Sequence, residues 1–139
     1  MRAVLDPNVI VSAVIASSGS PARVLERGFA GDYEVVVSES LLAELADVLA
    51  RPKLRSRVAE ADAAELQRRL SERAVLASDP ASAPPVHSRD RDDDYLLALA
   101  HIERAALVSG DRDLLELAGS APVFSPAEFL SLLDERTGA

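Results

Sequence analysis

The chain has 139 residues, a formal net charge of −8 at pH 7 and no cysteine. This length predicts one domain, residues 1–139. The absence of cysteine excludes disulfides and thiolate metal ligands, and the acidic balance argues against attachment to nucleic acid by bulk charge, because domains that bind in that way are usually basic.

No targeting or membrane segment is recognisable in the sequence. No apolar run approaches the ~18 residues of a transmembrane helix. Asp6 interrupts the first apolar run, and no basic segment precedes it as in a signal peptide. We therefore expect a cytoplasmic protein that makes no contact with a membrane.

Short apolar runs alternate with amphipathic segments along the chain. The predicted elements are a strand over 2–6, helices over 9–16 and 22–30, a strand over 33–37, helices over 39–50 and 61–73, a short edge strand over 75–77, a helix over 92–104, a strand over 106–109, a helix over 111–117, a short strand over 123–124 and a helix over 127–135. This alternation predicts an α/β fold with three α/β/α layers and a central, mainly parallel sheet of four to five strands. Functional groups of such folds gather at the carboxyl ends of the strands.

Residue types at the element ends predict where several helices begin and stop. We expect Asn8 to cap the first helix and Ser20 the second. Pro52 ends the helix over 39–50. The three prolines within 78–88 indicate a loop that crosses the molecule.

Acidic residues follow the predicted central strands. Asp6 ends the first strand, Glu44 lies on the helix after the second, and Asp111 follows the strand over 106–109. Each has an ordinary explanation alone, because strand-end aspartates cap helices and long acids often border an apolar stripe. Parallel strands, however, bring their carboxyl ends to one edge. We therefore expect these carboxylates to meet.

Four acids fall within the five residues Asp90–Asp94. Capping and the helix dipole account for one or two of them. Four like charges repel one another unless a cation is present. Carboxylates without cysteine suit Mg²⁺ or Mn²⁺, and such an ion can ionise a water and stabilise the charge that develops on a phosphate. His87 and His101 have no partner at metal-ligand spacing, so we expect both on the surface.

Four segments together resemble the PIN-domain ribonucleases, and they are residues 4–8, 38–45, 92–100 and 108–115. The resemblance covers essentially the whole chain and is closest to the toxin components of VapC-like toxin–antitoxin pairs. It implies a PIN-like fold, one or two bound Mg²⁺ or Mn²⁺ ions, and hydrolysis of RNA phosphodiesters that leaves a 5′-phosphate. It also implies a cognate antitoxin partner and a homodimer.

The resemblance assigns roles to particular residues. The catalytic, metal-binding carboxylates would be Asp6, Glu44, Asp93 and Asp111, with Asp6 as the central ligand. The supporting residues would be Asn8, which would hold Asp6 in place, Ser109, which would hydrogen-bond near the site, and Asp113 at the rim.

Two features depart from the family pattern. Pro7 stands where members usually carry a small residue, and it removes a backbone donor. The run Asp92–Asp94 leaves the third ligand open. We choose Asp93 because the apolar residues after it then fall as they do in the family's helix, and Asp92 is the alternative.

An RNA substrate needs cations on its path despite the negative net charge. A first cluster offers candidate RNA-binding residues, which are Arg51, Lys53 and Arg55. A second cluster consists of Arg68, Arg69 and Arg73. Salt bridges within one helix explain these arginines better than RNA binding does, because Glu65 and Arg69 are spaced i,i+4 and Glu72 lies nearby.

Other functions fit the sequence less well. A haloacid-dehalogenase-type phosphatase needs a second aspartate where Asn8 stands, and no Gly-rich Lys-Ser/Thr loop for a nucleotide is present. The remaining alternative is a PIN-fold binding module for an antitoxin or RNA with weakened catalysis. The complete set of acids argues against it, whereas Pro7 favours it.

Overall fold

A five-stranded parallel sheet forms the centre of the computed structural model, which describes residues 1–136; residues 137–139 of the predicted domain lie outside the described residues. The strand order is β3-β2-β1-β4-β5, and every neighbouring pair is parallel. The strands are β1 (Arg2–Leu5), β2 (Glu34–Val37), β3 (Val75–Leu76), β4 (Ala106–Val108) and β5 (Val123–Phe124).

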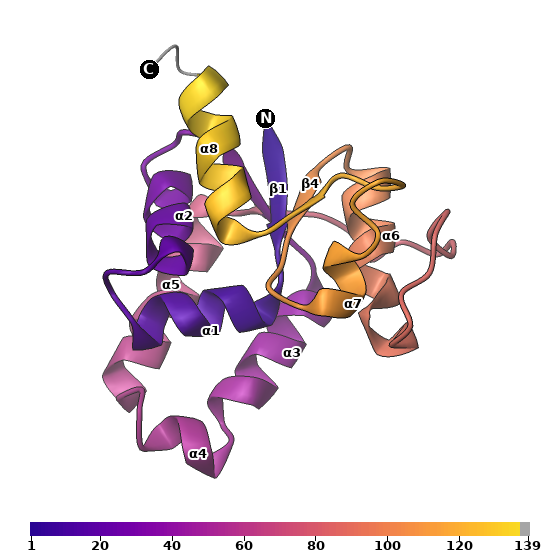
Figure 1. Cartoon of the computed structure of the whole chain (residues 1–139). Coiled ribbons are helices and arrows are strands. Elements are labelled where there is room, and N and C mark those ends of the chain that lie inside the picture. The colour runs from indigo at the N-terminus through magenta and orange to yellow at the C-terminus, as the bar shows by residue number, and fades with distance from the viewer. Residues whose placement is uncertain (137–139) are drawn as a thin grey trace.

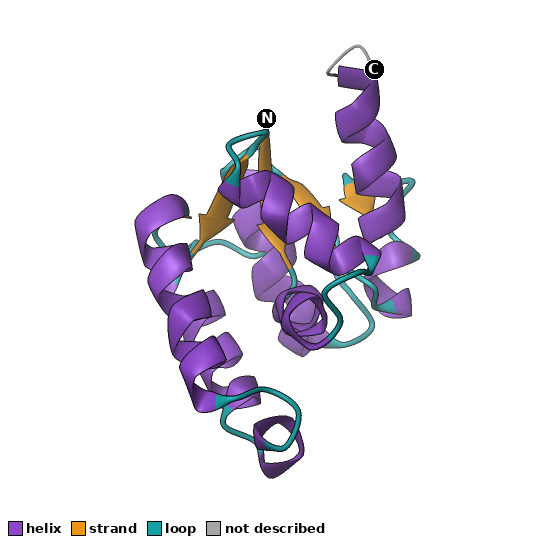
Figure 2. Ribbon diagram, turned by 90° about the vertical axis from the view of Figure 1, so that its left-hand side faces the viewer, coloured by secondary structure: helices purple, strands orange, loops and turns teal. Residues whose placement is uncertain are grey.

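Helices cover both sides of the sheet (Figure 2). They are α1 (Pro7–Ile15), α2 (Ser20–Phe29), α3 (Glu39–Leu49), α4 (Pro52–Arg55), α5 (Glu60–Arg73), α6 (Asp94–Ile102), α7 (Arg112–Leu115) and α8 (Pro126–Arg136), with a 3₁₀ turn η1 (Arg91–Asp93) before α6. The three-layer α/β/α arrangement predicted from the sequence is confirmed, and the sheet has five strands.

The central strands are apolar on both faces because helices cover both. Ala3, Val4 and Leu5 of β1 are fully buried, and so is Val108 of β4. Continuous burial of this kind is typical of a parallel strand inside an α/β fold. The strand ends are therefore the places where polar groups can stand without facing an apolar layer.

Some predicted element boundaries are wrong, for local reasons. Pro52 does not simply end a helix: it opens the additional helix α4, where its missing N–H is tolerated in the first turn. The helix predicted over 92–104 begins with η1 and stops at Ile102, because Arg104 adopts a left-handed φ of 52°.

Two predicted caps are also placed differently. The side chain of Asp6, and not that of Asn8, caps α1 by accepting a hydrogen bond from the backbone N–H of Asn8. Gly19 occupies the N-cap position of α2, so Ser20 is already helical.

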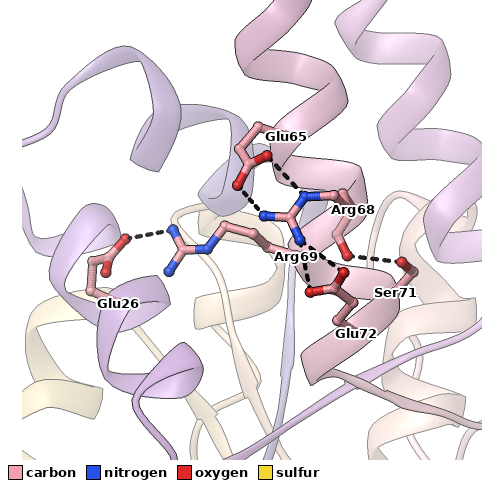
Figure 3. A network of polar contacts seen from close by, with 6 residues as sticks. All are labelled: Glu26, Glu65, Arg68, Arg69, Ser71 and Glu72. Carbon is pink, nitrogen blue, oxygen red and sulfur yellow. Dashed lines mark hydrogen bonds and ion pairs between the residues drawn. The ribbon is translucent and has the colours of Figure 1, made fainter.

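The segment from α3 to α5 extends away from the sheet, with α4 at its far end (Figure 1). Arg69 joins α5 to α2: its Nη1 lies 3.2 Å from Glu26 Oε1, and its guanidinium stacks 4.1 Å from the centre of the Phe29 ring. Glu65 pairs with Arg68, which also binds Glu72 (Figure 3). The predicted Glu65–Arg69 pair is therefore wrong, because Arg69 reaches across to another helix.

Within residues 1–136, no single helix has the length and apolar composition to cross a membrane. Helices α1 and α2 meet those two criteria only as a pair, and the pair is bent by 103°.

Close packing of α2 on the sheet predicts the effect of one added methyl group. A Cβ on Gly28 would lie 2.6 Å from Val35 Cγ2 and 2.8 Å from the Tyr33 hydroxyl. Tyr33 is held by its hydrogen bond to the Val24 carbonyl and by the Phe129 ring. Gly28→Ala should therefore lower the free energy of unfolding by about 1–3 kcal/mol despite its better helix propensity, as measured by urea denaturation.

Gly119→Ala provides the matched control, because a Cβ at Gly119 would meet no atom within 4 Å. It should change the free energy of unfolding by less than about 0.5 kcal/mol. Equal effects of the two substitutions would contradict the packing of α2 described above.

Candidate active site

The strand register places three polar side chains in one row across the sheet. Leu5 pairs with Val108 and Val4 with Val36, so Asp6 stands level with Ser109 on one side and Ser38 on the other. Asp6 is 4% exposed and both serines are fully buried. Figure 1 shows β1 descending to this end, where α1 begins close to α3 and α7.

The carboxylate of Asp6 is fixed by two donors. Ser109 Oγ donates to Asp6 Oδ2 at 2.8 Å, and the backbone N–H of Asn8 donates to Asp6 Oδ1 at 3.0 Å. Burial raises the pKa of Asp6, the charges of Glu44 and Asp111 add to that effect, and the two hydrogen bonds oppose it. Asp6 forms no ion pair within residues 1–136. Ser109, which the resemblance places near the site, thus bonds directly to Asp6, while its supporting role stays a prediction.

Asp111 is linked to Asp6 by the hydroxyl group of Ser109. The backbone N–H of Asp111 donates to Ser109 Oγ at 3.0 Å, and Asp111 Oδ1 accepts the N–H of Asp113 at 2.9 Å, which caps α7. The half-buried side chain of Asp113 makes no recorded polar contact within the described chain.

Asp93 comes to the same cluster from the 3₁₀ turn before α6. Burial, a hydrogen bond with the Asp111 carboxyl, and the charges of Asp6, Asp111 and Asp90 together raise the pKa of Asp93 from 3.8 to about 7. A carboxyl with such a pKa is mostly protonated below pH 7, because burial first and the neighbouring acids second disfavour its charged form. The structure thus brings Asp6, Asp93 and Asp111 together.

The other two members of the acidic run point elsewhere. Asp94 Oδ2 contacts His87 Nδ1 at 2.7 Å and Arg91 Nε at 3.1 Å, and Asp94 Oδ1 accepts the backbone N–H of Ser88 at 2.8 Å. Asp92 is exposed. Geometry therefore favours Asp93 over both, while its role as a ligand stays a prediction. His87 and His101 are exposed, as expected.

Glu44 enters the site from α3 and is held by a residue that the sequence analysis did not identify. The Tyr95 hydroxyl donates to Glu44 Oε2 at 2.5 Å. Burial and the Glu44 carboxylate raise the pKa of Tyr95, with Asp6 and Asp93 contributing charge, so the phenol stays protonated. Nothing in the sequence separates Tyr95 from an ordinary core aromatic.

The first two residues of α1, Pro7 and Asn8, bear on the site through their backbone. The side chain of Asn8 is exposed and makes no recorded hydrogen bond within residues 1–136, so the backbone N–H of Asn8, not its amide, holds Asp6. Pro7 is the first residue of α1, where a backbone N–H would have no helical partner. The backbone N–H that proline lacks would have no helical acceptor at this position, so α1 loses no hydrogen bond through Pro7.

The donor set suits a hard divalent cation, because it consists of carboxylate oxygens crowded without a counter-ion. Within residues 1–136, however, no three Asp, Glu or His side chains are gathered tightly enough to coordinate one ion as they stand. The carboxylates are neighbours in pairs, and they would have to turn toward a common point to share an ion.

The candidate RNA-binding residues separate into two places. Arg51 and Lys53 line a hollow of about 560 Å³ together with Asn8 and Ser12 of α1. Arg55 lies in a different hollow of about 430 Å³ between α3 and α5. Only Arg51 and Lys53 thus stand beside the start of α1.

Comparison with known proteins gives the class of protein. A profile of the PIN domain matches residues 2–113, a range that contains all four acids of the cluster. The chain belongs to the PIN-domain family. PIN domains are generally nucleases, so the coarse functional class is a hydrolase of nucleic acid.

The individual proteins that this chain resembles share less than a third of its sequence. The uncharacterized protein MJ1680 of Methanocaldococcus jannaschii is 28% identical over 118 residues, which are 84% of this chain and 75% of that protein. The crystal structure of VapBC2 from Rickettsia felis bound to a DNA fragment from their promoter superposes with a TM-score of 0.58 and 19% identity, covering 90% of this chain and 98% of that one. A domain of a functionally unknown protein from M. jannaschii gives a TM-score of 0.53, 16% identity and 89% coverage of both chains. The two structural likenesses establish the shared fold.

The raised pKa of Asp93 predicts a pH-dependent effect of Asp93→Asn. In the metal-free protein, protonated Asp93 favours the folded state below its unfolded pKa of 3.8, and this contribution is lost as the pH rises through about 7. Asp93→Asn should therefore match the wild type near pH 4 and exceed its free energy of unfolding at pH 8 by up to about 1 kcal/mol, since the side chain is partly exposed. Urea denaturation in EDTA measures the difference.

Asp92→Asn is the neighbouring control, and it should show no such gain because Asp92 faces solvent. A gain from Asp92→Asn that equals the gain from Asp93→Asn would contradict the placement of Asp93.

Proposed function

We propose that this protein is a metal-dependent endoribonuclease that hydrolyses RNA phosphodiester bonds. The observation that carries the proposal is the cluster of Asp6, Asp93 and Asp111, joined by Glu44. The pKa values of Asp6 and Asp93 are raised, and within residues 1–136 Asp6 has no counter-ion. Membership of a nuclease family supports it.

The candidate cofactor is Mg²⁺ or Mn²⁺, held by Asp6, Glu44, Asp93 and Asp111. A bound ion of this kind stabilises charge on a phosphate and lowers the pKa of a water. Ser109 and the N–H of Asn8 fix the two oxygens of Asp6, while Tyr95 orients Glu44. Fixed ligand orientation matters because small displacements of catalytic groups are costly in rate.

Arg51 and Lys53 supply a path for the RNA backbone. Both stand beside Asn8 at the start of α1, and the Arg51 guanidinium forms only a loose, exposed ion pair with Asp47 at 3.7 Å. Exposed pairs of this kind cost little to exchange for a phosphate. Arg68, in contrast, already binds Glu65 and Glu72.

We further propose that the chain acts in the cytoplasm as the homodimeric toxin of a toxin–antitoxin pair. The motif resemblance to VapC-like toxins supports this, and so does the fold shared with VapBC2. The cluster of carboxylates would suit an antitoxin segment of opposite charge.

Cleavage of a labelled RNA tests the enzymatic proposal. The wild type should cut in Mg²⁺ or Mn²⁺ and stop when EDTA is added. Asp6→Asn should lower the rate on the order of 10²-fold or more, as expected for loss of one charge-stabilising group. Tyr95→Phe should lower it by about 10-fold, because Glu44 loses its orienting donor.

Asp92→Asn serves as the control and should cut like the wild type. Circular dichroism must show each variant folded. A folded wild type that neither cuts RNA nor takes up metal would refute the enzymatic proposal and favour a binding module. The toxin role is tested by inducing expression in bacteria: the wild type should arrest growth and Asp6→Asn should not.

A further inference from the structure

A further and larger hollow lies at the opposite edge of the sheet from the acidic cluster. It has a volume of about 900 Å³ and is bordered by the first residues of β1, β4 and β5, by the end of α6 and by the last turns of α8. All five strands run in the same direction, so this is their amino edge. Figure 1 shows this end of the molecule, where the N-terminus and the last turns of α8 both lie.

The charge of this cavity is opposite to that of the chain. The chain carries 23 acidic residues and a net charge of −8, yet no aspartate or glutamate lines the cavity, whereas Arg2, His101, Arg104 and Arg136 do. Arg2 is already paired with Glu34 and Glu103. The guanidinium groups of Arg104 and Arg136 form no ion pair or side-chain hydrogen bond within residues 1–136. Among the described residues, nothing therefore competes with an anion for these two arginines.

The remaining wall is largely apolar. Leu97, Leu107 and Phe124 line it, and two of the three exposed large apolar residues of the described chain, Met1 at 39% and Ile102 at 54%, border it. A concave apolar surface with a few convergent polar groups, within the range of about 300–1,000 Å³, is what small-molecule sites share. The wall fits the hydrophobic part of a ligand, and the arginines fit a charged end.

Arg104 holds its position against local backbone preference. It follows α6 in the left-handed region, with φ 52°, and the N–H of Ala105 bonds the Ala100 carbonyl at 2.9 Å to close the helix end. Glycine is the residue that this helix-ending conformation favours. The sequence instead places a long cation at the wall of the cavity.

We propose that this cavity binds a small amphipathic anion, which is a molecule with an apolar chain and one carboxylate, sulfonate or phosphate group. Its anionic group pairs with Arg104 and Arg136, and its apolar part lies along Leu97, Leu107 and Phe124. The proposal does not rest on the nuclease activity, because the acidic cluster is at the other edge of the sheet.

Decanoate is the probe, tested on the full chain by isothermal titration calorimetry and ¹⁵N NMR. Decanoate should bind with one-to-one saturation, and the largest shift changes should fall in residues 100–107 and 120–124. Decyltrimethylammonium, which has the same chain and the opposite charge, should bind at least about tenfold more weakly, because its head meets arginines.

Arg104→Gly separates a ligand role from a structural one. It removes the cation but relieves the left-handed strain, so the melting temperature should stay or rise while the dissociation constant for decanoate rises by about tenfold, as expected for one lost charge-assisted contact. Arg23→Gln, an exposed arginine on α2 away from this cavity, removes the same charge and should leave decanoate binding unchanged.

Results of three kinds, which concern binding, selectivity and the accessibility of the cavity, would overturn the proposal. The first is no saturable binding of decanoate to the folded wild type. The second is equal affinity for decanoate and decyltrimethylammonium, or equal loss in Arg104→Gly and Arg23→Gln. The third is sedimentation and NMR evidence that a second copy of the chain covers this cavity in solution.

Discussion

The buried carboxylate of Asp6 is the constraint on which the rest of the site depends, because two donors hold it and no residue within 1–136 forms an ion pair with it. The strand register sets it level with Ser109, and α1 begins immediately after it so that the N–H of Asn8 can reach it. A buried charge that has hydrogen bonds but no ion pair is still unfavourable, and the nearby acids make it more so. The arrangement therefore lowers the free energy of unfolding of the metal-free protein. A bound cation would instead stabilise the folded state.

A parallel sheet gives the molecule two chemically distinct ends. The carboxyl edge gathers carboxylates from β1, α3, the turn before α6 and the segment after β4. The amino edge gathers arginines over an apolar hollow. The helix α6 joins these ends, since it begins beside Asp93 and finishes at the hollow. The net charge of −8 therefore conceals an uneven distribution.

The sequence predicts features whose cause is local or periodic. Apolar runs indicate the strands, and a parallel sheet then requires that Asp6 and the segment around Asp111 meet. Features that depend on tertiary packing are not predictable in this way. The Tyr95–Glu44 hydrogen bond joins residues 51 positions apart. Arg69 binds Glu26 on another helix, although Glu65 lies closer to it in the sequence. The choice of Asp93 came from the family resemblance; in the structure, its neighbours turn to solvent or to His87.

We expect the carboxylate cluster to hold a proton that a bound divalent cation displaces. Titration calorimetry with Mn²⁺ at pH 6.5, repeated in two buffers of different ionisation enthalpy, counts the protons released on binding. Because the pKa of Asp93 is about 7, we expect binding with release of about one proton. Binding without proton release, or no binding by the folded protein, would contradict the claim.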